Sequence, residues 1–146
     1  MAAEPDLHAT AADRLRADEQ RYTTQRRALV EQLAVAPQPV TIPELLGRLP
    51  GLAQSSAYRN LAVLERAGVV HRIVTTDEFA RYELAEDLTH HHHHLICTSC
   101  GGVTDFEVAP AVEADLEAAL AKVARRTGFQ VRHHRLDLVG TCPTCV

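Results

Sequence analysis

Apolar side chains recur three or four positions apart through the first fifty residues, which is the spacing of one helix face. This pattern predicts a short first helix, a second helix within residues 22–37 and a third within residues 41–49. Each is preceded by a residue type that caps helices. The expected caps are Asp6 for the first helix, Thr23 or Thr24 for the second, and a capping box of Thr41 and Glu44 for the third.

The next segment, "SSAYRNLAVLERAGVV" at residues 55–70, predicts a fourth helix. Ala57, Leu61 and Leu64 form one buried stripe, and Gly68 is placed to end the helix. A short linker separates this helix from the third, which is the arrangement of a helix-turn-helix. Residues 69–85 then alternate as two strands around a polar turn, so the first half of the chain is expected to be a winged helix.

The pattern changes after the polar link at residues 86–89. Strands are expected at 93–97, 102–108 and 129–140, with a helix at about 111–126 whose apolar face is formed by Val112, Leu116, Leu120 and Val123. The predicted fold class is therefore α+β. A winged helix-turn-helix domain at 1–85, with an N-terminal extension at 1–14, is joined by a hinge at 86–89 to a small α/β domain at 90–146.

Composition places the chain among ordinary globular proteins, with 46% hydrophobic and 23% charged residues. No apolar run is long enough to span a membrane, and the first twenty residues lack the pattern of a signal peptide. We therefore expect a cytoplasmic protein that does not bind membranes. In that compartment, four cysteines favour metal ligation or redox chemistry over structural disulfides.

The net charge of −4 hides an uneven distribution. Residues 14–72 carry nine arginines against five acidic residues, whereas residues 73–146 carry six basic residues against eleven acidic ones. Arginine is the side chain that best forks onto phosphate and guanine. The basic first half is compatible with DNA binding, and equally with an ordinary solvated surface.

The four cysteines form two matched pairs, Cys97-x-x-Cys100 and Cys142-x-x-Cys145. Two such pairs can close around one Zn²⁺ and leave no open coordination position, which indicates a structural metal. The alternatives are a thioredoxin-like redox pair or two disulfides. A redox motif does not need two matched pairs, so structural zinc is the preferred interpretation.

Five histidines occupy residues 90–94 and lead directly into a predicted strand. Successive side chains on a strand point to opposite faces, so His90, His92 and His94 would share one face, and His91 and His93 the other. The run could thus serve two metal sites placed back to back; alternatively it is a solvated loop that binds metal weakly. Candidate ligands elsewhere in the chain are His71, Glu83, Glu113, His133 and His134.

Three segments together resemble the ferric uptake regulator family of bacterial metal-dependent repressors. They are residues 55–70, "HHHHHLICTSCGGVTDFE" at 90–107 and "HHRLDLVGTCPTC" at 133–145, and the resemblance extends over roughly residues 15–146. The branch most similar is that of the zinc uptake regulators. The resemblance implies a zinc-responsive repressor of metal-uptake genes that binds a pseudo-palindromic double-stranded DNA operator as a homodimer. An iron, nickel, manganese or peroxide sensor of the same family is the alternative.

The resemblance also implies a role for individual residues. The structural zinc ligands would be Cys97, Cys100, Cys142 and Cys145. A regulatory site at the hinge would use His71, Glu83, His92 and His94, with Glu86 or Asp87 as alternatives to Glu83. A third site, in the dimerisation domain, would use His91, His93, Glu113 and His134, with Glu117 as the alternative to Glu113. DNA contacts would come from Tyr58 and Arg59, and Ser56, Arg26 and Arg27 are further candidates for DNA contact.

Two other functions fit the sequence less well. A zinc hydrolase would need an open metal position beside a general base, but the H-E-x-x-H motif is absent. A metal store would not need a winged helix. We therefore expect a regulator and not an enzyme.

Overall fold

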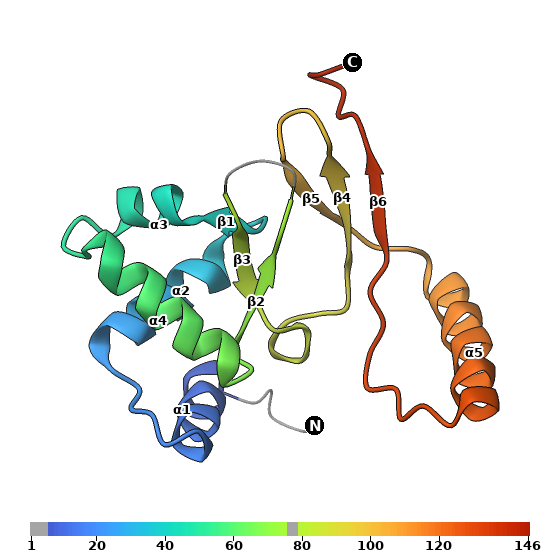
Figure 1. The fold of residues 1–146 in the computed structure, drawn as a ribbon, viewed down its shortest axis with the longest axis horizontal. Coiled ribbons are helices and arrows are strands. Elements are labelled where there is room, and N and C mark those ends of the chain that lie inside the picture. Colours follow the sequence, from blue (N-terminus) through green and yellow to red (C-terminus); the bar gives the residue numbers. More distant parts are fainter. Residues whose placement is uncertain (1–5, 76–78) are drawn as a thin grey trace.

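The computed structural model describes residues 6–75 and 79–146 and has an α+β fold with two parts (Figure 1). Helices lie on one side of a small sheet in the first part, and a second sheet is accompanied by one long helix in the second part. The elements are α1 (Leu7–Ala17), α2 (Thr24–Val35), β1 (Val40–Thr41), α3 (Ile42–Arg48), α4 (Gln54–Arg66), β2 (Val70–Ile73), β3 (Arg81–Leu84), the 3₁₀ turn η1 (Glu86–Leu88), β4 (His93–Cys97), β5 (Val103–Phe106), α5 (Pro110–Thr127) and β6 (Asp137–Gly140). The predicted fold class is confirmed.

The first three helices begin where the capping residues predict. The Asp6 carboxylate accepts a hydrogen bond from the backbone of His8, and the Thr23 hydroxyl accepts one from the next turn of α2. Thr41 and Glu44 form both halves of a capping box. These bonds satisfy N–H groups that have no partner inside the helix. Of the two caps considered for α2, the structure uses Thr23.

The core of the first part lies between α1, α2, α3 and α4. Leu29, Leu45 and Leu61 are completely buried there, and α1 adds the buried residues Ala11 and Leu15. Each such leucine contributes roughly 1.5–3 kcal/mol through removal of its side chain from water. Most of the segment predicted as an N-terminal extension therefore enters a helix that is part of this core.

Helix α4 ends at the predicted glycine. Gly68 has a φ of +79°. The Val69 N–H donates to the Leu64 carbonyl over 2.9 Å, and the Gly68 N–H donates to the Glu65 carbonyl over 3.0 Å. These two bonds form a Schellman motif, which turns the chain sharply from α4 into β2.

The first sheet has the strand order β1-β3-β2, and both pairings are antiparallel. β2 and β3 are the predicted wing hairpin, in which His71 lies opposite Glu83. The polar turn expected at residues 77–78 falls outside the described residues. Strand β1 was not predicted, because two residues are too few to show an alternating pattern.

The second sheet has the order β5-β4-β6, with β4 antiparallel to β5 and parallel to β6. A parallel neighbour requires a crossover, and α5 provides it. The last strand begins only at Asp137, so the prediction of a strand from residue 129 was wrong in its first part. Residues 129–136 form a long connection from α5, and at its end the Leu136 carbonyl accepts a hydrogen bond from the His94 N–H of β4 over 3.4 Å (Figure 1).

Helix α5 stands away from both sheets in Figure 1. The helix was predicted, and so was its apolar face, but that face is not covered in the single chain. Val112 is 54% exposed and Val123 is 44% exposed, and no residue of α5 is buried. The glycine after it, Gly128, ends the helix with a φ of +74°.

Candidate metal centres

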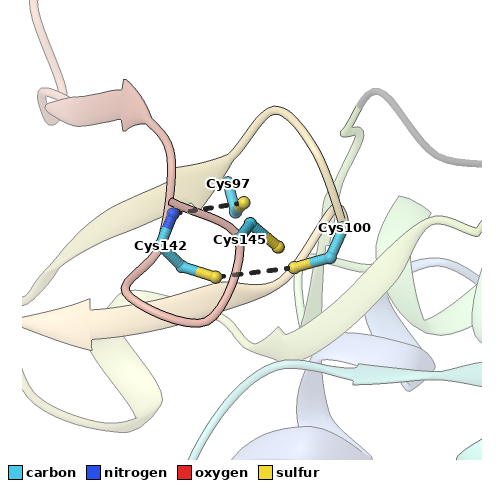
Figure 2. A group of neighbouring side chains, drawn as sticks. All are labelled: Cys97, Cys100, Cys142 and Cys145. Carbon is cyan, nitrogen blue, oxygen red and sulfur yellow. Dashed lines mark hydrogen bonds between the residues drawn. The ribbon is translucent and has the colours of Figure 1, made fainter.

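The two C-x-x-C turns meet at one end of the second sheet and form the cysteine cluster (Figure 2). Cys97 is the last residue of β4, Cys100 lies in the turn after it, and Cys142 and Cys145 follow β6. All four sulfurs lie within 4.8 Å of one another, and the Sγ atoms of Cys100 and Cys142 are 3.9 Å apart. Tetrahedral zinc with bonds of ~2.3 Å places neighbouring sulfurs about 3.8 Å apart.

Backbone N–H groups point at two of these sulfurs. The Cys142 N–H donates to Sγ of Cys97 over 3.3 Å, and the Gly102 N–H donates to Sγ of Cys100 over 3.4 Å. A Cβ at Gly102 would lie 3.2 Å from Sγ of Cys100, so this close approach favours glycine.

The electrostatics of the cysteine cluster favour a bound cation. Backbone hydrogen bonds from Cys100 and Cys142 lower the pKa of the Cys97 thiol to about 6. Hydrogen bonding to Cys142, together with burial, raises the pKa of the Cys145 thiol to about 12. The group therefore cannot hold four thiolates by itself, whereas a dication would stabilise them all. The cluster is consistent with structural zinc.

A second group, named here the second-domain cluster, consists of His91, His93, Glu113 and His134. Three imidazoles converge on one carboxylate from α5. Nε2 of His91 lies 2.7 Å from a Glu113 oxygen, and Nε2 of His93 and of His134 each lie 2.8 Å from one. Hydrogen bonds from His93, the larger contribution, and from His91 lower the pKa of Glu113 to about 2. Three imidazoles and a carboxylate form a donor set that suits Zn²⁺ and other divalent ions.

A third group, named the hinge cluster, consists of Glu83, His92, His94 and Asp105. Glu83 belongs to the wing strand β3, whereas the other three belong to the second domain. Nε2 of His92 lies 2.9 Å from Oε2 of Glu83, and Nε2 of His94 lies 3.0 Å from its Oε1. Asp105 approaches the same two nitrogens at 3.8 Å and 3.5 Å. The cluster therefore spans the two halves of the chain.

Charges within the hinge cluster are strongly coupled. Burial raises the pKa of Glu83, but hydrogen bonds from His71, His94 and His92 outweigh it and hold that pKa below its ordinary value. Burial lowers the pKa of His92 and His94, but hydrogen bonding raises both above 6.5. For His92, the hydrogen bond to the His90 carbonyl raises the pKa most, and the hydrogen bond to Glu83 comes next.

One hydrogen bond fixes which nitrogen His92 presents. Its Nδ1–H donates to the His90 carbonyl over 2.8 Å, so Nε2, which faces Glu83, is the nitrogen that can bind a metal once it has lost its proton. Metal-binding histidines commonly have this second-nitrogen bond. Asp105 Oδ1 and His93 Nδ1 are buried and have no hydrogen-bond partner in the structure. A cation bound in the hinge cluster would give Asp105 Oδ1 a partner.

The histidine run divides largely as strand alternation predicts. His92 and His94 face Glu83, and His91 and His93 face Glu113, although β4 itself begins only at His93. His90 was expected beside His92 and His94. It lies outside the hinge cluster, where its Nε2 is 3.0 Å from a carboxylate oxygen of Glu107.

Three of the four residues predicted for the hinge site lie together in the hinge cluster, while His71 lies beside it. Its Nδ1 is 3.4 Å from Oε1 of Glu83. Asp105 takes the fourth position and was missed, because only the register that places it opposite His94 brings it near. The two alternatives to Glu83 are engaged elsewhere: Glu86 contacts His91, and Asp87 pairs with Arg14.

The DNA-binding residues predicted on α4 are accessible. Tyr58 is 50% exposed, and Arg59 is exposed with Nη2 3.5 Å from the hydroxyl of the half-buried Ser56. Arg27 on α2 is exposed and pairs with Glu31.

Arg26 is placed differently from the other predicted DNA contacts. Its guanidinium donates to the Asn60 side chain over 3.0 Å, to the Arg21 carbonyl over 2.7 Å and to Gln20 over 3.3 Å. The expectation that Arg26 reaches DNA does not fit this arrangement. These bonds join α2 to α4 and to the segment before α2, so they orient α4.

Among residues 6–75 and 79–146, no helix has both the length and the apolar character that crossing a bilayer requires.

A winged helix-turn-helix joined to a domain with three clusters of metal-binding side chains defines a metal-responsive DNA-binding regulator. The sequence model described as "Ferric uptake regulator family" matches residues 17–139. The chain therefore belongs to the ferric uptake regulator family, whose members are transcriptional regulators and not enzymes.

Relatives within the family show what the chain is similar to. The peroxide operon regulator of Bacillus subtilis (strain 168) is 33% identical over 129 residues, or 86% of this chain and 83% of that protein. A zinc-bound manganese uptake regulator is 30% identical, with a TM-score of 0.60 over 91% of this chain and 98% of that one. The Helicobacter pylori ferric uptake regulator Fur has a TM-score of 0.73 at 24% identity, covering 99% and 97% of the two chains. None of these three is a zinc uptake regulator.

Proposed function

We propose that this chain is a repressor that binds operator DNA when a divalent metal ion occupies the hinge cluster. The observation that carries the proposal is the position of Glu83. It lies on the wing of the DNA-binding domain, yet its carboxylate contacts His92 and His94 of the second domain at 2.9 Å and 3.0 Å. A ligand held by all three would fix the wing relative to that domain. We also propose the cysteine cluster as the structural zinc site and the second-domain cluster as a third site.

The residues of the hinge cluster supply the switch. In the metal-free chain, His92 and His94 form hydrogen bonds with Glu83, and protons compete with metal because only neutral imidazoles can bind it. A bound divalent cation would offset the charges of Glu83 and Asp105 together. The metal strengthens DNA binding only as far as it prefers the arrangement of the two domains that fits DNA.

The active form is proposed to be a homodimer. The second half exposes apolar side chains that nothing covers in the single chain: Val112, Val123, Phe129, Val131, Leu138 and Val139. Continuous exposed apolar surface commonly marks a protein interface. A two-fold dimer would present two α4 helices to a pseudo-palindromic operator, in major grooves about 34 Å apart. This role places the protein in the cytoplasm, where the DNA is.

Contacts to DNA are assigned to the exposed side of α4 and to α2. Arg59 and Arg27 can donate to phosphate or guanine, and Tyr58 can pack against a thymine methyl. Ser56 can donate to phosphate and also holds the Arg59 side chain. Arg26 acts indirectly, because it positions α4 through Asn60.

A second, finer candidate is a peroxide-responsive repressor that uses iron. The hinge cluster has two imidazoles, two carboxylates and no thiolate. Imidazole and carboxylate donors are typical of non-haem Fe(II) sites, whereas a thiolate would favour zinc. The similarity to the Bacillus subtilis peroxide operon regulator supports the same interpretation. We place this candidate ahead of the zinc-responsive repressor of metal-uptake genes, which remains the alternative.

DNA binding measured under defined metals tests both levels of the proposal. A duplex is first selected from a random library by the metal-loaded protein, and its binding is followed by fluorescence anisotropy. Binding should require added Zn²⁺, Mn²⁺ or Fe²⁺ and should be lost in Glu83→Gln. Metal-independent binding would contradict the repressor mechanism.

The peroxide candidate is tested with the same duplex. Hydrogen peroxide should release the Fe²⁺-loaded protein and leave the Mn²⁺-loaded protein bound, because only the iron site is redox-active. Equal stability of the two complexes in peroxide would favour the zinc or manganese alternatives.

A further inference from the structure

The 3₁₀ turn η1 carries two adjacent acidic side chains that face opposite parts of the molecule. Glu86 contacts Nδ1 of His91, whose Nε2 belongs to the second-domain cluster. Asp87 forms a two-point ion pair with Arg14 of α1, and one of the two contacts is 3.2 Å long. Consecutive residues therefore contact both halves of the chain.

Arg14 extends this connection to the recognition helix α4. Its Nη1 donates to the Gly68 carbonyl over 2.7 Å, at the Schellman motif that ends α4. The backbone of the link follows the same route, since the Ala85 N–H donates to the Val69 carbonyl over 2.9 Å. Leu88 packs against the core of the first part. The end of α4 is thus held to η1 by side-chain and backbone bonds.

We propose that Arg14 and Asp87 are positioning residues that couple the second-domain cluster to the recognition helix through η1. A cation in that cluster would fix His91, and the bond from its other nitrogen would then order Glu86 and the rest of η1. An ordered η1 holds Asp87 against Arg14, and Arg14 against the end of α4. The coupling rests on the part of the proposed function that makes the second-domain cluster a metal site, but it does not require metal-dependent DNA binding.

The chemistry of the pair suits positioning more than stability. Asp87 is 66% exposed and Arg14 is 29% exposed, and exposed ion pairs contribute little to global stability. The two-point geometry nevertheless fixes orientation, as arginine does with carboxylates. The hydrogen bond from Arg14 is the main influence holding the pKa of Asp87 below its usual value, so the pair stays charged near neutral pH.

Amide hydrogen exchange, resolved to single residues by NMR, tests the coupling in the full-length dimer with and without added Zn²⁺. The reporters are the amides of Gly68 and Val69 at the end of α4, and those of Leu88 and Thr89 at η1. In the wild type, zinc should slow the exchange of all four amides by about two- to fivefold, which corresponds to the free energy of an exposed ion pair. Asp87→Asn should keep the slowing at η1 and reduce it at α4.

Two further variants make the result specific. Asp18→Asn is the matched control, because Asp18 pairs with Arg66 of α4 and does not touch η1. It should behave as the wild type. Glu113→Gln weakens the second-domain cluster and leaves the hinge cluster intact. It should reduce the zinc effect at α4 as Asp87→Asn does, and combining the two should add nothing.

Additive effects of those two substitutions, or full zinc protection of α4 in Asp87→Asn, would overturn the coupling. Loss of protection in Asp18→Asn would overturn it too, because any pair near α4 would then suffice. The outcome is separate from the proposed function. Zinc protection that passes through η1 in a protein without metal-dependent DNA binding would uphold the coupling and refute only the repressor mechanism.

Discussion

The two halves of this chain are held together by different chemistry. In the first half, apolar side chains from four helices and the wing make a closed core. In the described part of the second half, Cys97 and Val103 are the buried apolar residues, and the buried interior also includes His92, His93 and His94. Potential metal ligands therefore occupy positions where a larger domain would have hydrocarbon. We therefore expect the first half to fold on its own side chains, and the second half to depend on metal and on a partner subunit for its stability.

Among substitutions that test this difference between the two halves, the largest effect is expected at the cysteine cluster. Cys142→Ser should lose the structural zinc and unfold most of the second half, because structural zinc sites contribute on the order of 10–16 kcal/mol to folding. Native mass spectrometry would count the zinc, and NMR would show whether the signals of the first half persist. A zinc-free variant that stays folded and dimeric would contradict this account.

A smaller effect is expected from a cavity in the first half. Val30→Ala removes two methyl groups from a completely buried side chain of α2 and should lower the free energy of unfolding by about 2 kcal/mol. Val35→Ala on the same helix is the control, because Val35 is 75% exposed and its loss should change stability by less than about 0.5 kcal/mol. Chemical denaturation measures both. Equal losses would mean that this core is not the main support of the first half.

Two matched substitutions on α5 test which carboxylate belongs to the second-domain cluster. Glu113→Gln should weaken zinc binding at this cluster by at least about tenfold, while Glu117→Gln should leave it unchanged. Glu113 contacts three imidazoles, and the four-residue cluster does not include Glu117. Competition titration against a chelator gives both affinities. A loss confined to the Glu117 variant would reverse the assignment.

The smallest expected effect is that of pH. A change in pH should shift metal affinity and the stability of the metal-free protein in opposite directions. The pKa values of His92 and His94 are raised above 6.5, so protons compete with metal as the pH falls from 8 toward 6. Metal affinity should drop over that range by more than ordinary histidines would cause. The same raised pKa values stabilise the metal-free protein at the acidic end, and that stabilisation is lost as the pH rises through them. Isothermal titration and thermal melts at matched pH would show the two trends, and parallel trends would refute the explanation.

The sequence predicts the first half well because its signals are local. Capping residues and helical periodicity are read within one element, and Asp6, Thr23 and Gly68 all act where the pattern places them. Strand alternation likewise predicts that His92 and His94 face away from His91 and His93.

Other features depend on how separate elements meet in the folded chain, which no single element shows. Asp105 joins the hinge cluster through strand register, and Glu86 reaches His91 through the shape of η1. The open face of α5 and the short β6 belong to a surface that the single chain does not complete. Arg26 was expected to contact DNA because the sequence does not show that its hydrogen-bond partners lie on other segments.

The central claim is that one ion held between Glu83 and the second-domain histidines controls DNA binding, and reciprocal linkage tests it most directly. Coupling between two ligands is thermodynamically symmetric, so the selected duplex must tighten metal binding by the factor by which metal tightens DNA binding. Metal affinity should therefore be measured with and without DNA, in the wild type and in Glu83→Gln. The account predicts equal factors in the wild type and none in the variant. Metal affinity that is indifferent to DNA in the wild type would contradict it.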